Sequence, residues 1–171
     1  FNAKTRNWSI CIALDTLLVH ADVAPAFLPR LAPRWREAGI ELRRDARSLA
    51  LLAPSNGEGV VAAAPDDFGH EFLAPVAAVR VVDSLDEALE HIATYGTGHS
   101  DAIVTEDVSH ARRFTDEVDT AVCYVNASTQ FTDGAQFGLG AEIIDSTQKT
   151  IARGPTGLRE ITTYKWIVRG D

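Results

Sequence analysis

The sequence predicts an α/β fold in which helices cover a mostly parallel sheet, a three-layer arrangement. The main observation is an alternation of short apolar runs with helical periodicity along residues 76–125. A second observation is the composition. With 46% hydrophobic and 23% charged residues over 171 positions, it is ordinary for one globular domain with a sizeable core.

Five apolar runs predict the strands of this sheet. The run at residues 76–82 is strongly β-branched, which indicates a strand in the core. The other four are shorter and lie at residues 17–20, 40–42, 102–104 and 121–125. Residues 162–168 alternate enough to form a further strand that pairs with another partner. Residues 54–57, Pro-Ser-Asn-Gly, predict a turn.

Helical spacing of apolar residues predicts helices at residues 25–38, 85–95 and 108–118. The first begins at a proline and ends at Gly39. The second has the clearest start, since Ser84 and Glu87 have the spacing of a capping box, and it ends at Gly96. These helices lie between the predicted strands, which supports parallel strand pairing.

A further helix is predicted near the N-terminus, where apolar residues occupy positions 10, 13, 14 and 17 and Ser9 is a candidate cap. Cys11 would then lie in the first turn, where the helix dipole lowers the thiol pKa and favours a thiolate nucleophile. Backbone N–H groups there could also stabilise an oxyanion. The alternative is that Cys11 is a small buried apolar residue between Ile10 and Ile12.

Charge and cysteine content exclude several classes of protein. The 16 Lys and Arg residues against 24 Asp and Glu give a net charge of −8, which disfavours nucleic-acid binding. No apolar run approaches the roughly 20 residues of a membrane span, and the N-terminus lacks signal-peptide features. The two cysteines, Cys11 and Cys123, form no CxxC, and the five histidines have no metal-ligand spacing. We expect a reducing cytoplasm, no disulfide and no metal site.

Three loops carry candidate chemistry. Glu71 is either a general base or hydroxyl acceptor, or a solvated loop acid. His99 follows the predicted helix that ends at Gly96, and is either a proton carrier or a residue that stabilises the turn. The polar residues after the strand at 121–125 either hold a polar substrate or cap local backbone groups; they are Asn126, Ser128 and Thr129.

Several longer segments resemble the gamma-glutamyl phosphate reductases, also called glutamate-5-semialdehyde dehydrogenases, of the aldehyde dehydrogenase superfamily. They are VDSLDEALEHIATYGTGHSDAIVTE from residue 82, VNASTQFTDGAQFGLGAEI from residue 125, STQK from residue 146 and ARGPTGLREITTYKW from residue 152. NAKT, Cys11 and LDTLLVH resemble the nucleophile region of the same family. The likeness covers nearly the whole chain in order.

The resemblance implies an aldehyde dehydrogenase catalytic-domain-like fold and the NADPH-dependent reduction of L-glutamate 5-phosphate to the 5-semialdehyde, in proline biosynthesis. Cys11 would attack the acyl phosphate and form a thioester, and hydride transfer would then release the aldehyde. Glu71 would contact the nicotinamide ribose of NADP. Asn126, Ser128 and Thr129 would line the substrate tunnel.

The resemblance also implies a domain organisation. Residues 1–160 would form the nucleophile-bearing catalytic domain, and residues 161–171 a terminal strand of the oligomerisation type, through which the chain forms a homo-oligomer. The domain that mainly binds NADP would lie outside this chain. We therefore expect the chain alone to be inactive, either as an excised domain or as half of a split enzyme.

The chain departs from the family at positions near the expected site. It has Asn7-Trp8 where the family usually has Arg-Pro, Ile12 where it has Asn, and Ile144-Asp145 where it has Gly-Ile. These changes motivate one alternative, a divergent reductase of the superfamily with another substrate. A second alternative is a non-catalytic assembly module that docks through residues 162–168.

Overall fold

The computed structural model describes residues 1–52 and 60–171. The turn predicted at residues 54–57 lies outside the described residues. In chain order the elements are α1 (Asn2–Thr5), β1 (Thr16–His20), α2 (Ala24–Glu37), β2 (Glu41–Arg44), α3 (Ala46–Leu52), β3 (Val60–Ala62), the 3₁₀ helix η2 (Pro65–Gly69), β4 (Val76–Val82), α4 (Leu85–Tyr95), β5 (Ser100–Ile103), α5 (Val108–Glu117), β6 (Val122–Val125), the 3₁₀ helix η3 (Thr129–Phe131), β7 (Ile144–Ser146), β8 (Gly154–Thr156) and α6 (Leu158–Ile161).

The main sheet is parallel throughout, with strand order β1-β4-β2-β3. Strand β4 has the bounds predicted from its β-branched run, and most of its residues are buried. A strand inside a parallel sheet is covered on both faces, so its sequence is apolar without alternation. The predicted α/β class with a mostly parallel sheet is confirmed.

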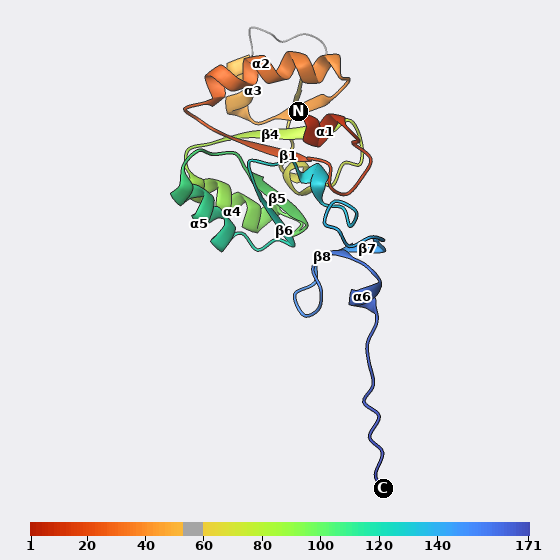
Figure 1. Ribbon diagram of the computed structural model, residues 1–171. Coiled ribbons are helices and arrows are strands. Elements are labelled where there is room, and N and C mark those ends of the chain that lie inside the picture. The colour runs from red at the N-terminus through yellow and green to blue at the C-terminus, as the bar shows by residue number, and fades with distance from the viewer. Residues whose placement is uncertain (53–59) are drawn as a thin grey trace.

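Helices lie on opposite faces of this sheet. Figure 1 shows α2 and α3 on one side of β1 and β4, and α4 and α5 on the other. The core between α2, α3 and the sheet contains Leu28, Trp35, Leu52 and Val79, all nearly inaccessible to solvent. Burial of such side chains supplies the main stabilisation of the domain. None of the helices in the described ranges has the length and apolarity to cross a membrane.

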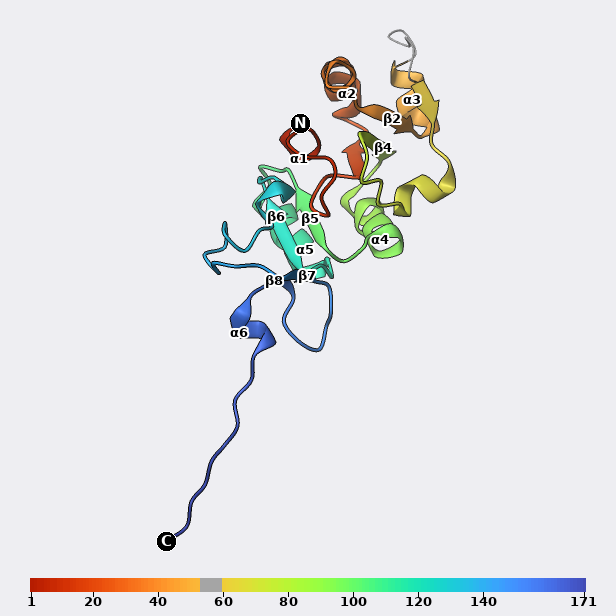
Figure 2. The same ribbon diagram turned by 90° about the vertical axis from the view of Figure 1, so that its right-hand side faces the viewer.

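Two smaller, two-stranded sheets follow the main sheet in the chain. Strands β5 and β6 are parallel, and β7 and β8 form an antiparallel ribbon. Gly154 of β8 has a positive φ of 76°, and a Cβ there would lie 3.2 Å from Cγ2 of Val122. Glycine therefore lets the ribbon approach β6 closely. Figure 2 shows the ribbon at one end of β5 and β6.

The helix predicted from Ser9 is wrong. The helix in this region is α1, and Cys11 lies in a turn closed by a hydrogen bond from Ala13 N to Ile10 O of 3.0 Å. Ser9 does not cap a helix, because its backbone N–H and its hydroxyl both donate to Oδ1 of Asn7. The apolar spacing reflects burial of residues 12 and 13 in a turn that precedes β1.

Residues 162–171 have no strand partner within the described chain and extend away from the body of the molecule (Figures 1 and 2). Tyr164, Trp166 and Val168 are largely exposed. The pairing of residues 162–168 with another chain therefore stays a prediction. The remaining predicted strands and helices are present, with ends that differ by one or two residues.

Candidate active site around Cys11

Cys11 lies beside a histidine and an aspartate from distant parts of the chain. Its Sγ donates to Oδ2 of Asp145 at 3.8 Å, and the same oxygen is 3.5 Å from Nε2 of His99. Cys11 is exposed, whereas the side chains of His99 and Asp145 are only 14% and 7% exposed. The site thus has an exposed cysteine beside a nearly buried carboxylate and a nearly buried imidazole.

A chain of hydrogen bonds holds the His99 ring. Nδ1 of His99 is 2.8 Å from Oγ of Ser100, which is 2.9 Å from Oγ1 of the buried Thr132. The hydroxyl of Tyr124 joins the same Thr132 oxygen at 2.8 Å. Because Nδ1 is engaged, the ring presents Nε2 to Asp145.

The surroundings of Cys11 raise the pKa of its thiol. Partial burial of the sulfur is the largest cause, followed by the negative charge of Asp145 and the hydrogen bond to it, with a further contribution from the charge of Glu71. The lowered pKa expected from a helix dipole is therefore wrong, because no helix begins at Ser9 and two carboxylates lie near the sulfur. The pKa of Asp145 is itself raised, first by burial and then by the charge of Glu142.

Glu71 lies in the loop between η2 and β4, and its carboxylate is exposed. The structure brings it within electrostatic reach of Cys11, as the effect on the thiol pKa shows. Asp15 joins this loop to the N-terminal helix through the fully buried Lys4. Nζ of Lys4 and the backbone N–H of Phe72 both donate to Oδ1 of Asp15 at 3.3 Å.

The loop after β6 braces the turn that carries Cys11. Oγ1 of Thr129 donates to the carbonyl of Ile12 at 2.7 Å, and Ser128 donates to the side chain of Asn2 at 2.9 Å. The buried amide of Gln130 donates to the carbonyls of residues 3 and 7. Two of the three predicted substrate-binding residues therefore contact the N-terminal segment that carries Cys11, and their role in substrate binding stays a prediction.

Asn126 is engaged elsewhere. It has a positive φ of 56°, and its side-chain amide exchanges hydrogen bonds with the backbone N–H and carbonyl of Thr105. This arrangement corresponds to the local capping role that the sequence left open. A role in substrate binding stays a prediction for Asn126.

Sequence reasoning did not assign roles to four residues of this region: Lys4, Asp15, Gln130 and Asp145. Asp145 could have been predicted as a site residue, because it is one of the positions at which the sequence departs from the family pattern. The others are polar residues whose burial only the tertiary structure reveals. In the described part of the chain, one ligand atom each from Cys11, His99 and Asp145 lies within 4.8 Å of the other two.

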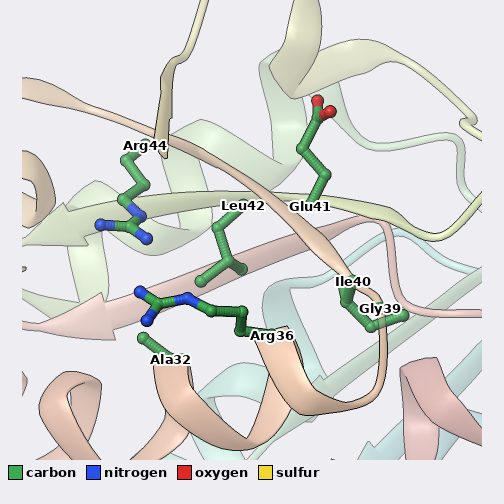
Figure 3. Close-up of a pocket in the computed structure, with 7 residues that line it drawn as sticks. All are labelled: Ala32, Arg36, Gly39, Ile40, Glu41, Leu42 and Arg44. Carbon is green, nitrogen blue, oxygen red and sulfur yellow. The ribbon is translucent and has the colours of Figure 1, made fainter. Parts of the chain in front are cut away.

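Two cavities in the described part of the chain lie outside this cluster. One of about 220 Å³ lies between α2 and β2, and Figure 3 shows the guanidinium groups of Arg36 and Arg44 lining it. Burial, and then the charge of Arg36, lower the pKa of Arg44. Another of about 380 Å³ lies beside the end of α4, with Asp101, Lys149 and Arg153 among its lining residues. Neither contains Cys11.

A model of the aldehyde dehydrogenase family matches residues 61–167, more than half of the chain. The chain belongs to the aldehyde dehydrogenase family. Within this family it is 58% identical over all its 171 residues to a gamma-glutamyl phosphate reductase of Dehalococcoides mccartyi. It is 54% identical, over 99% of its length, to the enzyme of that name from Chloroflexus aurantiacus. The chain spans about 40% of the length of these aldehyde dehydrogenase relatives.

The crystal structure of gamma-glutamyl phosphate reductase from Thermotoga maritima has the same fold. It superposes on 99% of this chain with a TM-score of 0.91 and 48% identity, and the chain covers 40% of it. The resemblance to this branch of the aldehyde dehydrogenase family, predicted from the sequence motifs, is confirmed.

Proposed function

We propose that this chain is the catalytic part of a gamma-glutamyl phosphate reductase, which reduces L-glutamate 5-phosphate to L-glutamate 5-semialdehyde with NADPH. The observation that carries the proposal is the exposed Cys11 in a braced turn, within reach of Glu71 and the loop after β6. The names of the relatives, which match this chain over its whole length, support the same reaction.

Cys11 is the nucleophile in this proposal. Its sulfur loses the thiol proton to water and attacks the acyl carbon, so a C–S bond forms and the C–O bond to the phosphoryl group breaks. Phosphate leaves with the electron pair, and a thioester remains on Cys11. NADPH, when bound, supplies the hydride that reduces the thioester carbon, after which the aldehyde leaves and the thiolate is restored.

The other residues of the site bind the cofactor and the substrate or position Cys11. The exposed carboxylate of Glu71 fits a cofactor ribose, because it can accept hydrogen bonds from hydroxyl groups beside the nucleophile. Thr129 holds the Cys11 turn through the carbonyl of Ile12. Ser128 and Asn126 are proposed to line the path of the substrate from the same loop.

The proposal includes the domain organisation and the partners. Residues 1–160 are the catalytic domain, and residues 161–171 pair with another copy of the chain to form a homo-oligomer. NADP is bound mainly by a domain outside this chain, and the protein works in the cytoplasm. The exposed aromatic and β-branched side chains of residues 164–168 support the pairing, because such residues favour a strand.

One observation favours a second candidate, a reductase of the same family with another substrate. The carboxylate of Asp145 is 3.8 Å from Sγ of Cys11, and its charge opposes the approach of an anionic acyl phosphate. An uncharged aldehyde would meet less repulsion. Residue 145 is also one of the positions where the sequence departs from the usual pattern of the reductases.

The test uses the full-length protein and the reverse reaction, with glutamate 5-semialdehyde, phosphate and NADP. We expect turnover, and a loss of at least about 1,000-fold on Cys11→Ser. Cys123→Ser is the matched control and keeps the activity. A Cys11→Ser variant with full activity would overturn the proposal. Faster turnover of an uncharged aldehyde than of glutamate 5-semialdehyde would favour the second candidate.

A further inference from the structure

The cluster of Cys11, His99 and Asp145 has the composition of a transition-metal site. Thiolate sulfur, imidazole nitrogen and carboxylate oxygen are the three ligand types that Zn²⁺ prefers in proteins. Here they come from the turn before β1, the turn before β5 and strand β7, and their ligand atoms lie within 4.8 Å of one another. We infer that Cys11, His99 and Asp145 bind a Zn²⁺ ion that reversibly masks the nucleophile.

The distances fit a single tetrahedral ion. With Zn–S near 2.3 Å and Zn–N and Zn–O near 2.1 Å, a tetrahedral centre separates its ligand atoms by roughly 3.3 to 3.6 Å. The observed separations are 3.8 Å from Sγ of Cys11 to Oδ2 of Asp145 and 3.5 Å from that oxygen to Nε2 of His99. The third separation, between Sγ of Cys11 and Nε2 of His99, is within 4.8 Å, so the side chains close around an ion by shifts of up to about 1 Å.

Buried polar atoms in the cluster provide an independent observation. Among the described residues, Oδ1 of Asp145 is buried without a hydrogen-bond partner, and the buried Nε2 of His99 has Oδ2 of Asp145, at 3.5 Å, as its polar neighbour. The Asp145 side chain that carries this atom is only 7% exposed. Buried polar atoms without partners are costly, and a coordinated cation removes that cost.

The surroundings orient the ligands and favour a cation. With Nδ1–H of His99 donating to Oγ of Ser100, Nε2 carries the lone pair and faces the site, as is typical of histidine ligands. The charges of Glu71, Glu142 and Asp133 act on the ligand side chains and add negative potential. Because Cys11 is exposed, the fourth coordination position is open to water.

Coordination would block the proposed reaction. The S–H bond of Cys11 breaks, its proton goes to solvent, and the sulfur electron pair forms the bond to zinc. That electron pair is then withheld from an acyl carbon until the ion leaves. The inhibition rests on the proposed function, whereas the binding stands on the geometry of the three side chains.

The test measures binding directly on the full-length protein, after chelator treatment. We expect Zn²⁺ to bind at one ion per chain in a calorimetric titration. We expect Co²⁺ to give an absorption band from sulfur-to-cobalt charge transfer, and Zn²⁺ to protect Cys11 from alkylation. Asp145→Asn and His99→Gln should each weaken binding at least 10-fold, and Cys11→Ser should abolish the band. Glu106→Gln, at an exposed position, and Cys123→Ser are matched controls that keep the site.

The outcomes separate this inference from the proposed function. Absence of binding at micromolar Zn²⁺, or unchanged affinity in folded Asp145→Asn and His99→Gln variants, overturns the metal site. Circular dichroism establishes that the variants are folded. Binding in a protein that fails to turn over glutamate 5-semialdehyde supports the metal site and contradicts the proposed function. If bound Zn²⁺ leaves turnover unchanged, the inference that zinc masks Cys11 is wrong.

Discussion

The carboxylate of Asp145 accepts a hydrogen bond from the thiol of Cys11, at 3.8 Å between Oδ2 and Sγ, although the two residues are 134 positions apart in the chain. The ribbon of β7 and β8 holds Asp145 in this place, since Asp145 is paired with Pro155 across the ribbon. A negative charge beside the sulfur disfavours the thiolate.

The pKa of Cys11 should fall when Asp145 is neutralised. Burial raises this pKa most, and the Asp145 charge is the next cause, so Asp145→Asn removes part of the shift. In metal-free protein that also carries Cys123→Ser, we expect the midpoint of alkylation rate against pH to move to lower pH. Alkylation near pH 8 should become several-fold faster. An unchanged midpoint would show that the Asp145 charge does not act on the thiol.

Glu71→Gln should weaken cofactor binding. If the carboxylate accepts hydrogen bonds from the ribose, the neutral amide loses about 1.5 kcal/mol of charged hydrogen bonding, or roughly 10-fold in the KM for NADPH. Glu106→Gln, at an exposed position outside the loop, is the control. Steady-state kinetics on the full-length protein measures the effect. Equal KM values for the two variants would remove Glu71 from the cofactor site.

Thr129→Val should lower kcat more than it raises KM. The substitution keeps the shape of the side chain but deletes the hydrogen bond to the Ile12 carbonyl, so the Cys11 turn is less well held. We also expect a loss of about 1 kcal/mol of stability. Thr115→Val removes a similar bond to a backbone carbonyl on the exposed face of α5, and should leave kcat unchanged. Equal effects of the two substitutions would contradict a positioning role.

Stability should depend on pH through His91. Burial, and then the charge of Arg80, lower the pKa of His91 to about 4. Nδ1 of His91 is 3.1 Å from Arg80 Nη1, and Phe68 and Tyr95 pack on the ring. The unfolded chain binds the proton near pH 6.5, so stability is greatest above that pH and falls as the pH decreases toward 4.

The size of this effect follows from burial, since His91 is 5% exposed. Between pH 7 and pH 4.5 we expect a loss on the order of 2 kcal/mol from this group. Thermal unfolding of His91→Gln should show a smaller decrease in its midpoint over the same interval than the unchanged protein. His110→Gln, on an exposed helix surface, is the control. A decrease of the same size in His91→Gln would exclude His91 as the cause.

Local patterns in the sequence determined the elements that depend on neighbouring residues. The cap of α4 is present as predicted, with Glu87 N donating to Oγ of Ser84 at 3.1 Å, because a cap involves residues three positions apart. The β-branched run of β4 has its predicted bounds, because burial on both faces selects such residues. The sequence also predicted Cys11 as a candidate nucleophile, and this role stays a prediction.

The tertiary structure alone decided the surroundings of that cysteine. The apolar spacing after Ser9 predicted a helix, but side-chain bonds to Asn7 and burial of Ile12 produced a turn instead. The sequence predicted a helix dipole that lowers the thiol pKa, whereas in the structure partial burial and then the charge of Asp145 raise that pKa. The positions of Asp145 and His99 beside the sulfur depend on how separate strands pack, and packing over such distances leaves no periodic signal in the sequence.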